Sequence, residues 1–201
     1  MTNETITVFG ATGAQGGGLA RAILADPQRR FRLRAVTRKP DSPAARALAD
    51  AGADIAVADL DDAASVRVAM QGAHGVFAVT NFWEHFSPER ELAQAANLAD
   101  AARDAKVPHL VWSTLEDTRR WVPLDDDRMP TLMGRYKVPH FDAKGEADAL
   151  FAERGVPTTR LYTSFFWENL IHFGMAPRRM PDGGLVFVLP MGDRPLPGIA
   201  A

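Results

Sequence analysis

Three glycines near the amino terminus limit what this chain can fold into more than any other feature. Gly10, Gly13 and Gly16 follow an apolar, strand-like run and precede a helical stretch. In such a turn the first glycine permits a sharp bend, and the second lets the backbone approach a pyrophosphate. The third allows close packing of helix and strand, and the free N–H groups of the helix attract phosphate. The spacing therefore predicts a dinucleotide-binding turn.

Strand-like runs alternate with helical stretches along the chain, which is the pattern of βαβ units. The expected strands are Thr5–Phe9, Leu33–Thr37, Asp54–Ala58, Gly75–Thr80, His109–Ser113 and Thr159–Tyr162. The expected helices lie near Gly16–Leu24, Pro43–Ala51, Asp62–Met70, Pro88–Ala105 and Pro139–Arg154. Right-handed crossovers then predict a Rossmann-type α/β fold with a doubly wound parallel sheet and a crevice at the carboxyl ends of its strands.

Length and composition set further bounds. At 201 residues the chain suffices for one α/β domain with a small appended region. We expect the dinucleotide-binding domain over residues 1–156, and the last sheet strand with a partial C-terminal subdomain over residues 157–201. A net charge of −2 gives no general attraction to nucleic acid or anionic membranes. Cysteine is absent and the histidines lack metal-binding spacing, so we expect no metal site. Cytoplasmic residence is the default expectation for such a chain.

The glycine turn, read as Gly-Ala-Thr-Gly-Ala-Gln-Gly over residues 10–16, resembles the extended short-chain dehydrogenase/reductase superfamily. Further segments narrow the resemblance to the NmrA-like family: Val36–Pro40, Asp59–Asp62, Phe141–Glu146 and Phe166–Leu170. The resemblance covers essentially the whole chain, although family members generally continue well beyond residue 201. It implies that the turn residues hold a dinucleotide, namely Gly10, Thr12, Gly13, Ala14, Gln15 and Gly16.

The second strand ends in Thr37-Arg38-Lys39. An NAD site usually has an acid about 20 residues after the glycines, which accepts hydrogen bonds from the ribose 2′-hydroxyl. A guanidinium instead binds a 2′-phosphate as a bidentate fork. Arg38 therefore predicts NADP(H) rather than NAD(H), with Lys39 as a second cation. The alternative is that both are solvated loop cations.

The ends of other strands supply more candidate contacts. Asp59, at the carboxyl end of the third strand, would face the adenine and accept from its amino group, a role that the resemblance supports, with Leu60 beside it. Asp61 or Asp62 is most simply the N-cap of the next helix. Thr80 and Asn81 would line the crevice near the inner ribose.

Two aromatic residues are also candidates for the dinucleotide site. Phe82 and Phe166 are each as consistent with packing as with dinucleotide contact.

Reductases of the superfamily carry Tyr-x-x-x-Lys on one helix face. The matching pair here is His140 and Lys144, so the lysine is present and the tyrosine is not. The helix start after Pro139 and the Lys144 ammonium both disfavour imidazolium, which makes His140 a reluctant proton donor. Tyr136 precedes Pro139 and is not expected on the Lys144 face. With Ser113 at the superfamily's hydroxyl position, the candidate catalytic residues are Lys144, His140 and Ser113. In the superfamily this lysine holds the nicotinamide ribose and lowers the pKa of the tyrosine, so the resemblance makes Lys144 a candidate cofactor contact as well.

Two functions remain open. The resemblance implies a dinucleotide-sensing regulator that acts on a protein partner, and the missing tyrosine favours it. The alternative is an NADPH-dependent reductase of small electrophiles such as quinones or enones, since hydride transfer can use a solvent proton.

The C-terminal part carries its own expectation. Leu185–Leu189 reads as one more strand. We expect the apolar side chains before it to lack part of their packing, so that the chain is a truncated piece or forms a homo-oligomer; they are Phe165, Phe166, Trp167, Leu170, Ile171 and Phe173.

Overall fold

The computed structural model of the chain describes residues 4–171, 176–188, 192–195 and 197–200. These residues belong to two compact units, Met1–Tyr162 and Thr163–Ala201. The last strand of the sheet lies in the first unit, so the division falls after Tyr162, whereas the sequence placed it after Val156. Among the described residues, no helix is both long and apolar enough to cross a membrane.

Six parallel strands form the sheet of the first unit in the order β3-β2-β1-β4-β5-β6. They are β1 (Glu4–Val8), β2 (Phe31–Thr37), β3 (Asp54–Val57), β4 (Gly75–Ala78), β5 (Leu110–Thr114) and β6 (Thr158–Tyr162). The α-helices are α1 (Ala14–Ala25), α2 (Pro43–Asp50), α3 (Ala63–Met70), α4 (Pro88–Asp104) and α5 (Pro139–Glu153). Two 3₁₀ turns, η1 (Phe82–Glu84) and η2 (Thr118–Arg120), follow β4 and β5. The expected strands and helices of this unit are all present, and the doubly wound α/β fold is confirmed.

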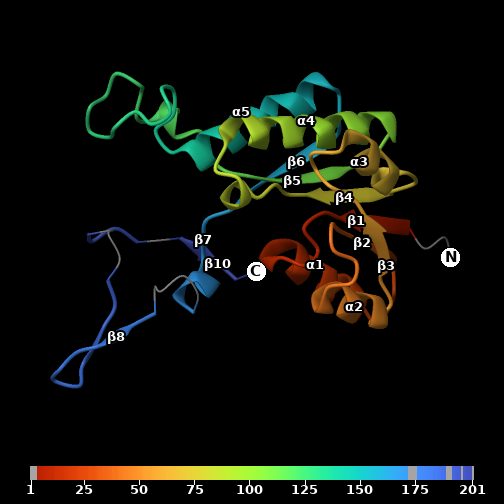
Figure 1. Ribbon diagram of the computed structural model, residues 1–201, viewed down its shortest axis with the longest axis horizontal. Coiled ribbons are helices and arrows are strands. Elements are labelled where there is room, and N and C mark those ends of the chain that lie inside the picture. Colours follow the sequence, from red (N-terminus) through yellow and green to blue (C-terminus); the bar gives the residue numbers. More distant parts are fainter. Residues whose placement is uncertain (1–3, 172–175, 189–191, 196, 201) are drawn as a thin grey trace. The chain divides into compact units, whose positions relative to one another are not determined.

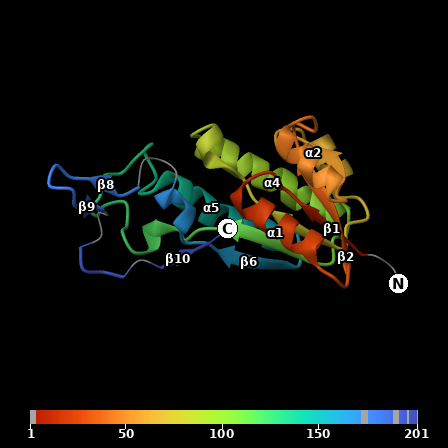
Figure 2. The ribbon, with the colours of Figure 1, turned by 90° about the horizontal axis from the view of Figure 1, so that it is seen from below.

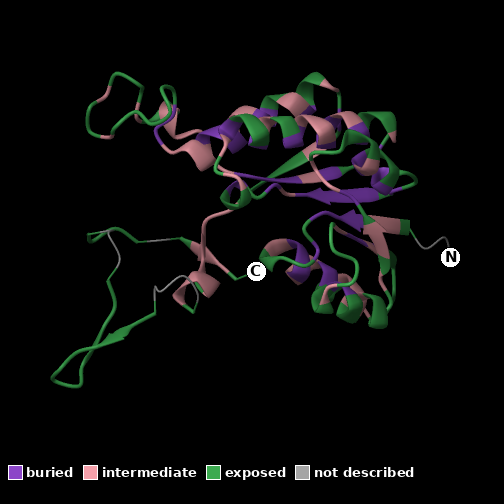
Figure 3. Cartoon of the chain, in the orientation of Figure 1, coloured by how far each residue is buried: buried purple, intermediate pink, exposed green. Residues whose placement is uncertain are grey.

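Helices cover both faces of this sheet, with α3, α4 and α5 on one face and α1 and α2 on the other (Figure 1). Side chains on a strand point alternately to the two faces, so neighbouring residues enter different cores. Val8 packs in the core beside α1, while Phe9 packs in the core beneath α4. Figure 2 views the unit from the α1 side, and Figure 3 shows that burial concentrates in the central strands. The central strands are thus covered on both faces, as expected for a parallel sheet.

The strand order reverses between β1 and β4, which pair in parallel with Val8 opposite Phe77. In open α/β sheets, ligands bind outside the carboxyl ends of the strands at such a switch point. The glycine turn follows β1 and the Thr80 segment follows β4, so both lie at this point.

The second unit is built from short elements. β7 (Phe165–Phe166) pairs in parallel with β10 (Gly198–Ile199), and η3 (Trp167–Leu170) follows β7. The expected strand Leu185–Leu189 is shorter than predicted: β9 covers Leu185–Val186 and pairs antiparallel with β8 (Arg178–Arg179). The pairing spans only two residues of each strand, and Leu189 and Phe173 lie outside the described residues.

Candidate functional site

The glycine turn has the geometry that its spacing predicts. Gly10 adopts a φ of +66°, in the left-handed region that disfavours other residues. A Cβ on Gly16 would lie 2.3 Å from the carbonyl oxygen of Gly10, so only glycine fits there. The Gly13 N–H donates to the same carbonyl at 2.9 Å. The first turn of α1 therefore lies directly against the end of β1.

The amino terminus of α1 is left open by the chain. Its N-cap, Gly13, has no side chain to accept a helix N–H, and no acid occupies the first turn. By contrast, side chains of Ser42, Asp62 and Ser87 cap α2, α3 and α4. The expected capping role of Asp62 is thus confirmed. Residues Thr12, Gly13 and Ala14 are exposed, so the first turn of α1, whose N–H groups no side chain caps, presents its positive end to a site open to an anion.

Gln15 joins the glycine turn to the end of β5. The buried Ser113 hydroxyl donates to Gln15 Oε1 at 2.7 Å. The candidate catalytic hydroxyl therefore lies beside the candidate phosphate site. In this arrangement it orients the first turn of α1.

Arg38 follows β2 and pairs with an acid that the sequence analysis missed. Its Nη2 lies 2.7 Å from Glu84 Oε2, and both side chains are about half exposed. Glu84 ends η1, and its Oε1 accepts from Asn81 Nδ2 at 3.2 Å. Lys39 is exposed, and its backbone N–H donates to Thr37 Oγ1. The structure thus brings Arg38 and Asn81 together through Glu84.

The segment after β3 is ordered by its own carboxylates. Asp59 Oδ1 accepts the Asp61 N–H at 3.0 Å, and the half-buried Leu60 packs against the core. Asp61 forms a forked ion pair with Arg90 of α4 and accepts from Gln94. The Arg90 guanidinium lowers the pKa of the Asp61 carboxyl to about 2. Asp61 therefore joins this segment to α4 and does not cap α3.

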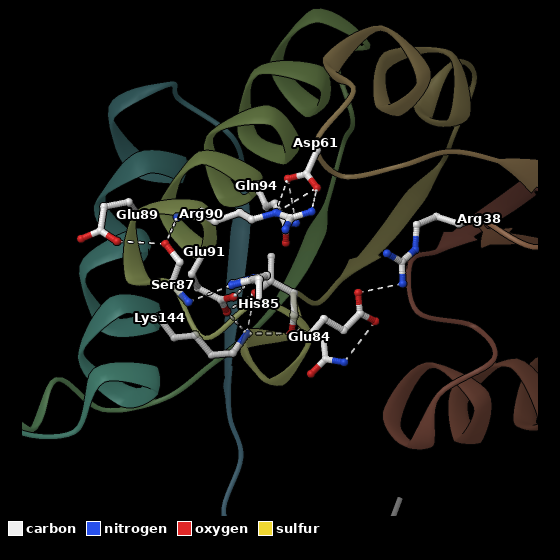
Figure 4. A network of polar contacts seen from close by, with 12 residues as sticks. Arg38, Asp61, Glu84, His85, Ser87, Glu89, Arg90, Glu91, Gln94 and Lys144 are labelled. Atoms are coloured by element: carbon white, nitrogen blue, oxygen red, sulfur yellow. Dashed lines mark hydrogen bonds and ion pairs between the residues drawn. The ribbon is translucent and has the colours of Figure 1, made fainter. Parts of the chain in front are cut away.

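Lys144 lies in a buried polar cluster at the end of β4 (Figure 4). Its Nζ lies 2.9 Å from Glu91 Oε1 and donates to Thr80 at the carbonyl oxygen and at Oγ1. Thr80 Oγ1 donates in turn to Glu91 Oε1 at 2.5 Å, and Glu91 is fully buried. Burial lowers the pKa of the Lys144 ammonium, and Glu91 opposes this shift. Lys144 therefore has a counter-ion of its own within the chain.

His85 completes this cluster from the η1 side. Its side chain is 3% exposed, and its Nε2 lies 3.4 Å from Glu91 Oε2. His85 Nδ1 accepts the Ser87 N–H at 3.1 Å, which leaves Nε2 directed at the carboxylate. The contact becomes an ion pair when the imidazole is protonated.

His140 is held among aromatic rings at the start of α5. Its ring centroid lies 4.6 Å from that of Trp83 and 4.9 Å from that of Phe141. Burial, and then the Lys144 ammonium, lower the pKa of His140, against Asp142 and Glu91. The expected direction is therefore supported, with burial as the larger cause. A neutral imidazole in this setting is a poor proton donor near neutral pH.

Tyr136 does not replace the missing tyrosine. It lies outside α5, pairs with Leu132 in an isolated bridge, and is 1% exposed. Guanidinium carbons of Arg119 and Arg135 lie 5.4 and 5.1 Å from its ring centroid. Burial raises the pKa of its hydroxyl, whereas a catalytic tyrosine needs a lowered one.

The motif around Lys144 also anchors the long loop between β5 and α5. The buried Asp142 carboxylate accepts N–H groups of Thr118, Lys137 and Val138. A Cβ on Gly145 would lie 2.7 Å from the Asp117 nitrogen, so glycine lets this loop approach the helix. Asp142 and Gly145 of the segment Phe141–Glu146 therefore hold the loop against α5.

The two aromatic candidates lie in different units. Phe82 is 5% exposed and its ring contacts those of Trp83, His85, Phe86 and His140. Phe166 is half-buried in β7 of the second unit, where it pairs with Ile199. Dinucleotide contact by either remains a prediction. In the part of the chain that the structure describes, no group of three or more acids or histidines could hold a metal ion.

Sequence reasoning missed three residues of this site: Glu84, His85 and Glu91. One signal was available for Glu91, which lies on the same helix face as the buried Ala95, Leu98 and Ala102. An acid on an otherwise apolar stripe needs a buried partner. No comparable spacing pointed to Glu84 or His85.

Fold and site together define a Rossmann-type α/β protein. At the switch point of its sheet lies a glycine turn of the type found in phosphate-binding sites, and no side chain caps the helix that follows it. The NmrA-like family model matches residues 2–199, and the chain belongs to that family.

Curated relatives and solved structures agree with this assignment. A family oxidoreductase (hkm9) of Aspergillus hancockii is 42% identical over 56% of this chain and 34% of its own length. Another (lnbB), of Aspergillus flavus, is 36% identical over 85% of this chain and 50% of its own length. The chain thus spans half or less of these relatives. NmrA, a negative transcriptional regulator, in complex with NADP matches with a TM-score of 0.78 and 25% identity, over 99% of this chain and 58% of that one.

Two further solved structures carry dinucleotides. NmrA in complex with NAD gives a TM-score of 0.79 and 25% identity over the same shares of the two chains. An NADPH-dependent quinone oxidoreductase of Escherichia coli, with NADPH, gives 0.62 and 25% identity, over 83% of this chain and 51% of that one. These neighbours include both a regulator and a reductase.

Proposed function

We propose that this chain binds a nicotinamide dinucleotide at the carboxyl edge of its sheet, with the pyrophosphate at the amino terminus of α1. The observation that carries the proposal is the open helix end, which lacks both a capping side chain and an acid. Gly16 lies against the Gly10 carbonyl, which keeps the turn tight enough for close backbone approach. The NAD and NADP complexes of NmrA support the same conclusion.

The preferred dinucleotide is NADP(H). Arg38 and Lys39 follow β2 at the position where NAD sites carry an acid. Arg38 is half exposed and can turn its guanidinium fork to a 2′-phosphate. Asp59, Thr80 and Asn81 follow β3 and β4 at the same edge and are the other proposed contacts.

The role that the geometry supports best is that of a dinucleotide-sensing regulator that acts through a protein partner. His140 replaces the expected tyrosine, and burial lowers the pKa of its imidazole, so among the described residues the group four positions before Lys144 is a poor proton donor. Lys144 is already paired with Glu91 and is largely shielded from solvent. A sensor of the nicotinamide pool is expected in the cytoplasm.

The second candidate is an NADPH-dependent reductase of small electrophiles. The oxidoreductase names of the relatives favour it, as does the likeness to the Escherichia coli quinone oxidoreductase. Hydride transfer itself needs the reduced dinucleotide and an acceptor, and the proton can come from solvent.

Calorimetric titration with NADPH, NADP⁺, NADH and NAD⁺ tests the binding proposal, and failure of all four to bind refutes it. NADPH-oxidation assays on a panel of quinones and enones separate the two roles. Turnover in the usual enzyme range, about 1–1,000 per second, would favour the reductase. Binding with slower or undetectable turnover would favour the regulator.

A further inference from the structure

The cation that we assign to the 2′-phosphate already has an anionic partner in the chain. Arg38 Nη2 lies 2.7 Å from Glu84 Oε2, and the two side chains point toward one another in Figure 4. Asn81 holds the other oxygen of Glu84 at 3.2 Å. Glu84 is therefore aimed at Arg38 by a second contact.

A carboxylate and a phosphate use the same guanidinium fork, and they repel one another when close. We propose that Glu84 is a specificity-determining residue that competes with the 2′-phosphate for Arg38. NADP(H) must displace Glu84, whereas NAD(H), which carries only a hydroxyl there, leaves the ion pair intact. Arg38 favours NADP(H) over NAD(H), and Glu84 makes that difference in affinity smaller. This inference rests on the proposed function.

Displacement of Glu84 also has a structural consequence, because Glu84 is the last residue of η1. Phe82, at the start of η1, is buried, while Trp83 is 59% exposed and its ring contacts that of His140. Release of Glu84 frees the exposed end of η1 while Phe82 remains anchored. The surroundings of Trp83 therefore change when a 2′-phosphate binds.

The test uses adenosine 2′,5′-bisphosphate and adenosine 5′-monophosphate, which differ only in the 2′-phosphate and lack nicotinamide. Because an exposed ion pair is weak, we expect Glu84→Gln to tighten bisphosphate binding about threefold to tenfold. The monophosphate affinity should not change. Glu153→Gln is the matched control, because Glu153 is also an exposed acid. It ends α5, which leads to the amino end of β6, whereas the candidate site lies at the carboxyl ends of the strands. Unchanged or weaker bisphosphate binding by Glu84→Gln overturns the inference.

The variant Arg38→Ala distinguishes failure of the Glu84 inference from failure of the proposed function. If Arg38→Ala leaves bisphosphate affinity unchanged, Arg38 is not the 2′-phosphate ligand and the proposed function is wrong at this point. If Arg38→Ala weakens binding but Glu84→Gln does not tighten it, only the role of Glu84 is wrong.

Tryptophan emission supplies a second readout. The bisphosphate should shift the emission of the wild-type chain, and the shift should be lost in Trp83→Phe. The monophosphate should produce no shift. In Glu84→Gln the emission should resemble that of the bound wild type before any ligand is added. A bisphosphate-induced shift that persists in Trp83→Phe would show that η1 does not respond.

Discussion

Lys144 Nζ lies 2.9 Å from Glu91 Oε1, and both groups are buried at the carboxyl end of β4. The lysine comes from α5 and the glutamate from the first turn of α4, so the ion pair joins two helices at the candidate site. The ammonium also donates to the Thr80 hydroxyl. Contact of Lys144 with the nicotinamide ribose stays a prediction.

Glu91→Gln should destabilise the fold strongly, because it leaves the Lys144 ammonium buried without a counter-charge. Loss of one partner of a buried pair costs about 3–5 kcal/mol. Chemical denaturation measures this loss. The double variant Glu91→Gln/Lys144→Met should recover a large part of the lost stability. Equal stability of the single and double variants would show that the two side chains are not coupled.

Arg38→Ala should weaken NADPH binding by about 1.5–3 kcal/mol, which is typical of a charge-assisted hydrogen bond. NADH binding should change little, since its ribose carries no 2′-phosphate. Calorimetry on both dinucleotides checks this. Equal losses of binding free energy for NADPH and NADH would show that Arg38 does not bind the 2′-phosphate.

Gly16→Ala should abolish dinucleotide binding, because the added Cβ would lie 2.3 Å from the Gly10 carbonyl oxygen. The turn must open, and the helix end moves away from β1. Gly52→Ala is the control: Gly52 has a φ of +104°, but a Cβ there meets no atom within 4 Å. We expect Gly52→Ala to lower the melting temperature through backbone strain and to bind dinucleotide normally. Normal binding by Gly16→Ala would contradict the tight turn.

His140 should titrate below its usual value, since burial and Lys144 lower its pKa. A histidine with a depressed folded-state pKa contributes stability above the unfolded value of about 6.5. That stability is lost as the pH falls from about 6.5 toward the folded-state pKa. NMR titration of the imidazole and denaturation at several pH values measure both effects, and His140→Phe should remove this part of the pH dependence. An imidazole that titrates above 6.5 would refute the shift.

Changing His140 to Tyr restores the superfamily's residue four positions before Lys144. We expect slow or undetectable NADPH oxidation by the wild-type chain and a higher rate in His140→Tyr. The assay is NADPH oxidation with the quinone and enone panel. A variant no faster than the wild type would show that the tyrosine alone does not complete the site.

The apolar surface of the second unit predicts self-association. Trp167 is 42% exposed and Ile171 is 76% exposed, while Phe165, Phe166 and Leu170 are half-buried. We expect light scattering to show an oligomer at high concentration. A monomer with Trp167 shielded from a polar quencher would contradict this expectation.

Several features of this protein could be read from the sequence by itself. The alternation of strands and helices, the glycine turn and the cation after β2 depend on neighbouring residues, so local spacing and residue chemistry predict them. Within the first unit the predicted strands and helices are present, because apolar runs and helical stretches alternate along the chain and are bounded by turn residues. The missing tyrosine was equally readable, since a helix places residues four apart on one face.

The partners of the key side chains were decided only by the tertiary structure. Arg38 meets Glu84, and Lys144 meets Glu91, because parallel strands and their crossovers bring the ends of β2, β4 and α5 to one edge of the sheet. A charged residue in a sequence shows that a counter-charge is needed once it is buried, but does not show which acid supplies it. That choice depends on which helix packs over which strand, and long-range packing sets it.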